Sequence, residues 1–351
     1  MLTSTSLRHI LRVLVLLAIA ASAAAQQISS SATGQPSQKQ RLQPTATQSP
    51  SASPAQSSAP QPGTQDASPN DEAGNFVFKS QVQEVVLHAT VVDDKRRLAT
   101  HLDRGAFTVF EDGRPQTITS FHRDDVPVAI GVLIDNSGSM RDQREEVNRA
   151  VLNLIRASNP EDQVFVVNFS QNPYLEQDFT SDVNLLENAL RHSSSQGSTA
   201  LYDAVVASAK HLESNQHFDK RILLVITDGK DNMSRETLRD TTQQLQKKNG
   251  PVLYAIGLMG PEGQNRGREA LQQLADATGG SAFFPQSLDQ VSEITSALAH
   301  DIRSQYTLAY KPQNENAQAL YHPIVVEARA PGLGRLTVRT RSGYYAGESV
   351  R

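Results

Sequence analysis

Five oxygen-bearing side chains, spread over three short segments, have the chemistry to bind a hard cation. They are Asp135, Ser137, Ser139, Thr199 and Asp228. The set supplies two carboxylates and three hydroxyls, and it contains no nitrogen or sulfur ligand. Such all-oxygen sets suit Mg²⁺, Ca²⁺ or Mn²⁺. Two carboxylates balance the charge of a divalent ion, and the hydroxyls act as neutral ligands.

The surrounding sequence places these residues at the ends of predicted strands or at the start of a helix. The apolar run 128–134 predicts a strand buried on both faces, and Asp135 follows it directly. Asp228 follows a second apolar run, and Thr199 precedes a helix predicted over 201–212. The carboxyl ends of parallel strands are the usual ligand crevice of an open α/β sheet, so we expect the five side chains at one rim. The alternative is a simple helix cap at 135–139, which would not require Asp228 and Thr199.

Residues 126–304 alternate between predicted strands and helices of about a dozen residues. The strands are predicted at 128–134, 164–169, 221–227, 252–257 and 282–284, with a short edge strand at 174–178. This alternation predicts an α/β fold, with a doubly wound, mostly parallel sheet and helices on both faces.

Segments of β character flank the α/β unit on both sides. Residues 75–125 contain a β-branched run and the hairpin signal Glu111-Asp112-Gly113. Residues 305–351 contain three predicted strands, at 306–310, 323–328 and 336–340. Isolated pieces of two or three strands are marginal alone. We therefore expect the two flanks to form one small sheet or sandwich, with the α/β unit inserted between them.

The N-terminal region predicts export. Residues 1–25 combine a positive start, an apolar run at 13–21 and the small residues Ala23-Ala24-Ala25, as a cleavable signal peptide does. The run is shorter than the ~20 residues of a spanning helix, so we expect no stable membrane span after cleavage. Residues 26–74 are rich in Ser, Gln and Pro, which predicts a disordered linker. The expected location is periplasmic, cell-surface or secreted.

Composition and missing motifs argue against several classes of function. The formal net charge of −4 gives no basic surplus for nucleic acid, and the absence of cysteine excludes disulfides and thiol chemistry. The histidines fall in no metal-ligand pattern, and Gly-x-Ser-x-Gly is absent. The three motif segments contain no His, Lys or Glu to act as a general base. We therefore expect a protein that is not an enzyme.

The motif set resembles the von Willebrand factor type A domain over about residues 126–304. The resemblance rests on Asp-x-Ser-x-Ser, a downstream Thr after a Gly, and a later Thr-Asp-Gly in this strand and helix order. It implies the family's metal-ion-dependent adhesion site, in which Ser137, Ser139 and Thr199 touch the ion directly. Asp135 and Asp228 would act directly or through water. The flanking segments 107–113 and 341–344 resemble a bacterial exported subgroup of the family.

The function that the resemblance implies is cation-dependent binding. A divalent cation, Mg²⁺ first with Ca²⁺ and Mn²⁺ as alternatives, would engage an acidic group of a protein partner in adhesion or another protein interaction. Two alternatives remain open. One is an assembly scaffold in which the metal is purely structural, and the other is a metal-dependent hydrolase.

Overall fold

A computed structural model describes most of the chain beyond residue 83. The described residues are 40–41, 84–123, 125–191, 196–215, 217–229, 231–258, 265–313 and 321–346. All of them lie within one compact unit, Lys39–Arg351. The predicted signal peptide and almost all of the predicted linker lie outside the described residues. None of the helices described is both long and apolar enough to cross a membrane.

A seven-stranded sheet forms the centre of the α/β part, in the order β1-β8-β7-β6-β9-β10-β11. The strands are β1 (Gln40–Arg41), β6 (Val128–Asp135), β7 (Gln163–Phe169), β8 (Pro173–Thr180), β9 (Lys220–Thr227), β10 (Val252–Gly257) and β11 (Ala282–Phe283). The five strands from β7 to β11 in this order pair in parallel, and β8 and β1 add antiparallel at one edge. The predicted mostly parallel sheet is confirmed. The edge pairing of β1 was not predicted, because it begins within the predicted linker.

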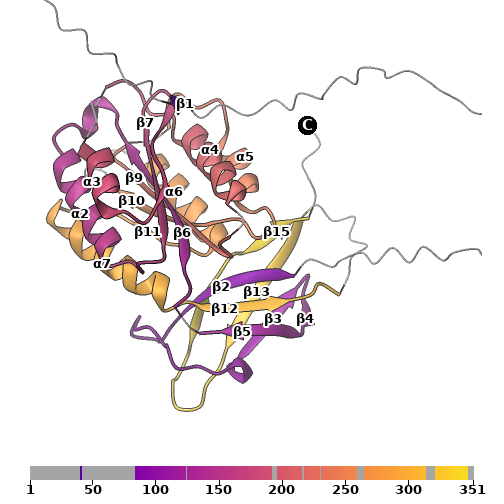
Figure 1. The fold of residues 1–351 in the computed structure, drawn as a ribbon. Helices are drawn as coiled ribbons and strands as arrows, with labels where there is room; N and C mark the ends of the chain where they lie inside the picture. The colour runs from indigo at the N-terminus through magenta and orange to yellow at the C-terminus, as the bar shows by residue number, and fades with distance from the viewer. Residues whose placement is uncertain are drawn as a thin grey trace, which may run out of the picture. The chain divides into compact units, whose positions relative to one another are not determined.

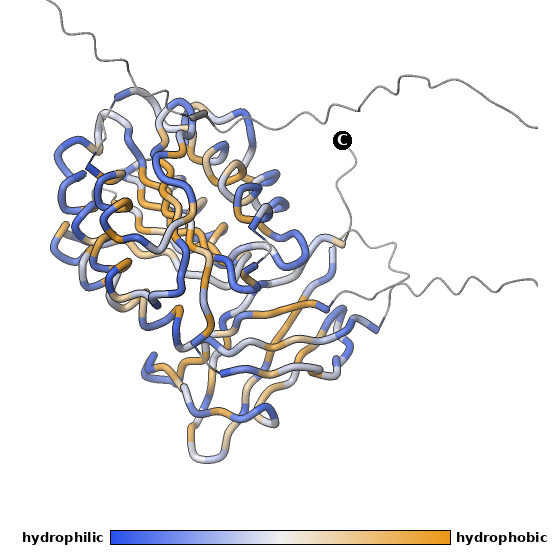
Figure 2. The backbone as a smooth tube through the Cα atoms, viewed as in Figure 1, coloured by the Kyte–Doolittle hydropathy of each residue, from blue (hydrophilic) through white to orange (hydrophobic). Residues whose placement is uncertain are grey.

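Helices cover both faces of this sheet (Figure 1). They are α2 (Arg144–Arg156), α3 (Val183–Arg191), α4 (Leu201–Ser214), α5 (Leu238–Leu245), α6 (Asn265–Thr278) and α7 (Asp289–Arg303). Alternate residues of a strand point to opposite faces. Accordingly Ile130 and Val132 pack with α2, α3 and α7, whereas Ala129 and Leu133 pack with α4, α5 and α6. Figure 2 shows the apolar strands enclosed between helices whose outer faces are polar.

The β flanks form a sandwich of two four-stranded sheets. One has the order β14-β2-β12-β5 and the other β15-β13-β3-β4. The strands are β2 (Val85–Val92), β3 (Phe107–Glu111), β4 (Arg114–Gln116), β5 (Ile118–His122), β12 (Tyr306–Tyr310), β13 (Tyr321–Ala328), β14 (Thr337–Arg339) and β15 (Gly343–Tyr345). Both sheets combine strands from before and after the α/β part, and they share one apolar core. The expectation of one joint β module is confirmed.

A buried arginine joins this sandwich to the α/β part. Arg341 donates hydrogen bonds to the backbone carbonyls of Leu245, Lys247 and Gly250 at 3.1–3.2 Å. Those carbonyls belong to the last residue of α5 and the turn that follows it. Arg341 therefore supplies side-chain donors to the end of α5, where the Lys247 carbonyl also accepts from the Gly250 amide at 2.9 Å.

Candidate metal centre

Asp135 forms the floor of the candidate site. It is the last residue of β6 and is completely buried. Its Oδ1 accepts a hydrogen bond from the Ser137 amide at 2.8 Å, and its Oδ2 accepts one from Thr227 Oγ1 at 2.6 Å. Burial raises the pKa of Asp135, and the nearby charge of Asp228 acts in the same sense, while the hydrogen bonds from Thr227 and Ser137 oppose the rise. The aspartate is thus held in a fixed orientation by two neighbouring strand ends.

Two serines and Asp228 continue the set from this floor towards solvent. The Ser137 and Ser139 hydroxyl oxygens lie 3.2 Å apart, and Ser139 Oγ donates to Asp228 Oδ1 at 3.0 Å. Asp228 is buried and Ser139 is exposed. Burial raises the pKa of Asp228, against the effect of the bond from Ser139. These oxygens therefore run from the interior to the exposed rim of the sheet.

Thr199 reaches the same rim through backbone contacts of its loop. Gln196 N donates to Asn136 O at 2.8 Å, and Gly138 N donates to Gly197 O at 3.4 Å. On the other side, a Cβ placed on Gly229 would lie 3.7 Å from Thr199 Oγ1. The Thr199 loop therefore lies against both the 136–138 turn and the residue after Asp228. The structure brings together all three segments that the sequence singled out.

Asn232 and Asp231 hold this arrangement through hydrogen bonds to the Thr199 loop and to the start of α4. Asn232 Oδ1 accepts from the Thr199 amide at 2.9 Å, and the Asn232 amide donates to Thr199 O at 3.0 Å. Asp231 Oδ1 accepts from the Tyr202 amide at 3.3 Å. The available signal was the cluster Asp-Asn-Met-Ser at 231–234, since Asp, Asn and Ser side chains often bond to nearby backbone in turns.

Arg144 is a further residue that the sequence analysis missed. It is the first residue of α2, and it is buried behind the site. Its guanidinium donates from Nη1 to the backbone oxygen of Asp135 at 3.2 Å and from Nη2 to Asn168 Oδ1. Burial lowers its pKa to about 10, against the attraction of Glu176 and Asp135. It therefore stays charged at neutral pH. Its position three residues before the buried Val147 was the signal that it shares the inward face of the helix.

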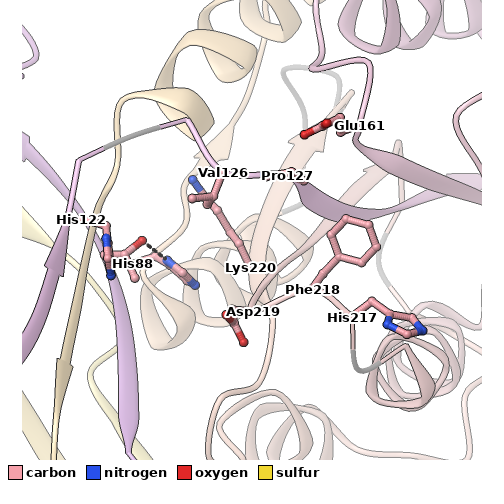
Figure 3. Close-up of a pocket in the computed structure, with 10 residues that line it drawn as sticks. His88, His122, Val126, Pro127, Glu161, His217, Phe218, Asp219 and Lys220 are labelled. Carbon is pink, nitrogen blue, oxygen red and sulfur yellow. Dashed lines mark hydrogen bonds between the residues drawn. The ribbon is translucent and has the colours of Figure 1, made fainter.

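A cavity of about 600 Å³ lies away from this rim, lined in part by His88, Lys220 and Thr307 (Figure 3). His88 Nδ1 and Thr307 Oγ1 form a hydrogen bond of 3.2 Å, and burial lowers the pKa of His88 to about 3. Lys220 Nζ donates to the Ile302 carbonyl near the end of α7, and burial lowers its pKa to about 8. Both cavity groups already bond to protein atoms, so the rim at Asp135 is the stronger candidate.

Comparison with known proteins finds a family match within the α/β part. Residues 130–230 match the family model of the von Willebrand factor type A domain. Similar solved structures include von Willebrand factor type A from Catenulispora acidiphila (14% identity, 76% of each chain covered, TM-score 0.44). An aerotolerance-related membrane protein from Bacteroides fragilis also matches (18% identity, 50% of this chain and 98% of that chain, TM-score 0.43).

A third similar structure is the PilB minor pilin from Streptococcus sanguinis, at 14% identity and a TM-score of 0.44. The match covers 54% of this chain and 64% of the pilin, which is less than two thirds of the pilin's length. No protein with a curated description matches the chain.

Proposed function

Because residues 130–230 of the chain form a von Willebrand factor type A domain, we propose that the protein is an exported, cation-dependent binding module. Domains of this family commonly mediate protein interaction or adhesion, often bind a divalent cation, and are typically not enzymes. The proposed ligands are Asp135, Ser137, Ser139, Thr199 and Asp228. The cation that we favour is Mg²⁺. A carboxylate of a protein partner would complete the coordination from the solvent side.

The observation that supports this proposal is the convergence of five oxygen ligands at one sheet rim. Asp135 and Asp228 both have a raised pKa because burial penalises their charge. A divalent cation between them would compensate both charges, and the neighbouring hydroxyls add neutral oxygen ligands. The donor set therefore fits a hard cation. Ser139, which is exposed, marks the side from which a partner would approach.

Binding is favoured over hydrolysis by the residue types around the site. A metal-dependent hydrolase needs a general base within hydrogen-bond reach of the attacking water. Segments 135–139, 197–201 and 227–229 supply no histidine, lysine or glutamate for that role. In the scaffold alternative the metal is bound, but no partner carboxylate coordinates it. Removal of the cation would therefore abolish partner binding by a binding module and would leave it intact in a scaffold.

The first experiment measures the metal alone. Titration of the full chain with Mg²⁺ and Mn²⁺ is compared with Asp228→Asn and with Asp276→Asn, an exposed control on α6. We expect the control to bind as wild type and Asp228→Asn to lose at least about tenfold in affinity, as removing support from a metal site does. A hundredfold excess of cation over Kd should stabilise the wild type by about 2.7 kcal/mol. An unchanged melting temperature with Mg²⁺ and Mn²⁺ would refute metal binding.

The second experiment separates binding from scaffolding. The immobilised chain is used to capture proteins from an extracellular fraction, with and without EDTA. We expect capture to require the cation and to be lost in Asp228→Asn but not in Asp276→Asn. Capture that survives both EDTA and Asp228→Asn would exclude engagement through the cation.

A further inference from the structure

A second group of side chains of metal-binding type lies in the β-sandwich, on elements other than those that carry the rim residues. Glu111 ends β3, Asp112 begins the turn after it, and His322 lies on β13. Strands β3 and β13 pair antiparallel with Glu111 opposite Ile324, and the Asp112 amide donates to Pro323 O at 3.0 Å. This register places the turn beside the start of β13. One ligand atom from each of the three side chains lies within 4.8 Å of the others.

The three side chains form a largely buried cluster of one nitrogen and two carboxylate donors. His322 Nδ1 lies 2.8 Å from Asp112 Oδ2 and 3.9 Å from Glu111 Oε1. The His322 and Glu111 side chains are 2% and 3% exposed, whereas that of Asp112 is 33% exposed. An ion could therefore enter past Asp112 and be shielded from water on its other sides.

Two tyrosines hold the ligands in orientation. Glu111 Oε2 accepts hydrogen bonds from Tyr310 at 2.5 Å and from Tyr344 at 3.4 Å, while Oε1 faces His322. The ring of Tyr344 also stacks on the His322 ring, with centroids 5.1 Å apart. Hydrogen bonds and packing of this kind, made by groups that do not touch the metal, pre-orient metal ligands. The same tyrosine thus fixes both the carboxylate and the imidazole.

The backbone fixes the third ligand. Asp112 and Gly113 have φ values of 51° and 73°. Positive φ at both central residues is the requirement of a type I′ hairpin turn, which Asp-Gly sequences satisfy. The position of the Asp112 carboxylate is therefore set by the turn and by its amide bond to β13.

We propose that Glu111, Asp112 and His322 bind a transition-metal ion of the Zn²⁺ class, at a site separate from the rim at Asp135. One imidazole nitrogen with two carboxylates is a donor set for Zn²⁺, unlike the oxygen-only set of the rim. Zinc bonds of about 2.1 Å in a tetrahedron place ligands about 3.4 Å apart, between the 2.8 and 3.9 Å separations found here. Nδ1 would exchange its contact with Asp112 for the ion, and the two carboxylates would balance its charge.

The role that this site would have is a staple between the two flanks of the chain. Asp112 precedes the α/β part and His322 follows it, 210 residues later. The chain has no cysteine, so no disulfide can link these flanks. A metal bound only by the folded protein stabilises the folded state. The ion would therefore lock β3 to β13 at the point where both sequence flanks meet.

The test is a Zn²⁺ titration of the full chain in excess Mg²⁺, with Co²⁺ absorption as a second probe of nitrogen coordination. His322→Gln removes the nitrogen ligand but keeps a side chain that can bond Asp112. His122→Gln, at an exposed histidine of the same sandwich, is the matched control. We expect wild type and control to bind Zn²⁺ with equal affinity and His322→Gln to bind at least about tenfold more weakly. Zn²⁺ should raise the melting temperature of the first two proteins only.

Two further variants make the result decisive. Asp135→Asn disables the rim centre, and we expect it to bind Zn²⁺ as wild type does, whatever happens to its Mg²⁺ affinity. Asp112→Asn keeps a turn-forming residue of the same size and should also weaken Zn²⁺ binding, which covers the case that His322→Gln fails to fold. Zn²⁺ binding that is absent in wild type, or unchanged in Asp112→Asn and His322→Gln, overturns the proposal and leaves an ordinary hydrogen bond between Asp112 and His322.

Discussion

Replacement of Thr227 by valine tests how the fold prepares Asp135 for a cation. Thr227 is completely buried at the end of β9. Its hydroxyl donates to Asp135 Oδ2 at 2.6 Å and accepts from the Gly229 amide at 3.2 Å. Valine keeps the shape of the side chain and removes only these polar contacts. The substitution therefore acts on Asp135 without removing a proposed ligand.

The expected magnitude follows from the two lost hydrogen bonds. A bond to a charged group contributes about 1.5–3 kcal/mol, and an amide left without an acceptor costs about 1 kcal/mol more. We expect the free energy of unfolding at pH 7 to fall by about 2.5–4 kcal/mol. The Asp135 carboxylate is then less stabilised, so its pKa rises further and its affinity for a cation should fall by about 10- to 100-fold.

Thr227→Ser is the matched control, because it keeps the hydroxyl and loses only a methyl group. Mg²⁺ and Mn²⁺ titration calorimetry reports the affinity, and urea denaturation without metal reports the stability. Thr227→Ser should retain cation affinity close to that of wild type. Equal affinity in Thr227→Val and Thr227→Ser would refute the idea that this hydroxyl orients Asp135.

Three further substitutions, one of them with a matched control, probe the fold away from the site. Lys220→Met removes an ammonium whose pKa burial lowers from 10.5 to about 8. Between those two pKa values the unfolded chain binds more protons than the folded chain. The free energy of unfolding of wild type, relative to that of the variant, should therefore rise by about 2 kcal/mol from about pH 7.5 to 9.5. Parallel pH profiles of the two proteins would contradict this. Arg341→Met removes the guanidinium donor from the Leu245 and Gly250 carbonyls, while the Lys247 carbonyl keeps the Gly250 amide. The loss should lower the free energy of unfolding in urea by about 2–4 kcal/mol, and a loss below about 1 kcal/mol would contradict this. Gly131→Ala would place a Cβ 2.4 Å from Phe165 Cζ and should cost about 1–3 kcal/mol by thermal unfolding, whereas Gly138→Ala, with open space around it, should cost little.

The fold was predictable where burial leaves a pattern along the chain. The unbroken apolar run that became β6 predicted a central strand, since both of its faces are covered by helices. The structure extends that strand by one residue, to Asp135, which the sequence pattern assigned to the turn. A sequence pattern places the end of a buried strand where its apolar residues stop. Asp135 is polar and still buried, because Thr227 on the neighbouring strand donates a hydrogen bond to its carboxylate.

Helix ends were less predictable, because their partners are distant in sequence. The residue pattern of 236–248 is compatible with a helix over the whole segment, whereas α5 spans only Leu238–Leu245. At its start, Thr237 and Asp240 form a capping box, a local Thr-x-x-Asp signal. At its end, Arg341, almost a hundred residues away in the sequence, donates a hydrogen bond to the carbonyl of Leu245. The first signal was available in the sequence, but the second requires the assembled sandwich.

The same separation explains what was found and missed at the rim. The five candidate oxygen ligands were singled out from motif residues at strand ends or at the start of a helix, positions that parallel topology brings together. Arg144 and Asn232 were missed, because their partners lie on other strands and loops. Burial penalises the charges of Asp135 and Asp228, and the hydroxyl donors Thr227 and Ser139 beside the two carboxylates offset part of this penalty. The compensation is incomplete, since both aspartates keep a raised pKa, and that residual cost of negative charge is what a divalent cation would relieve.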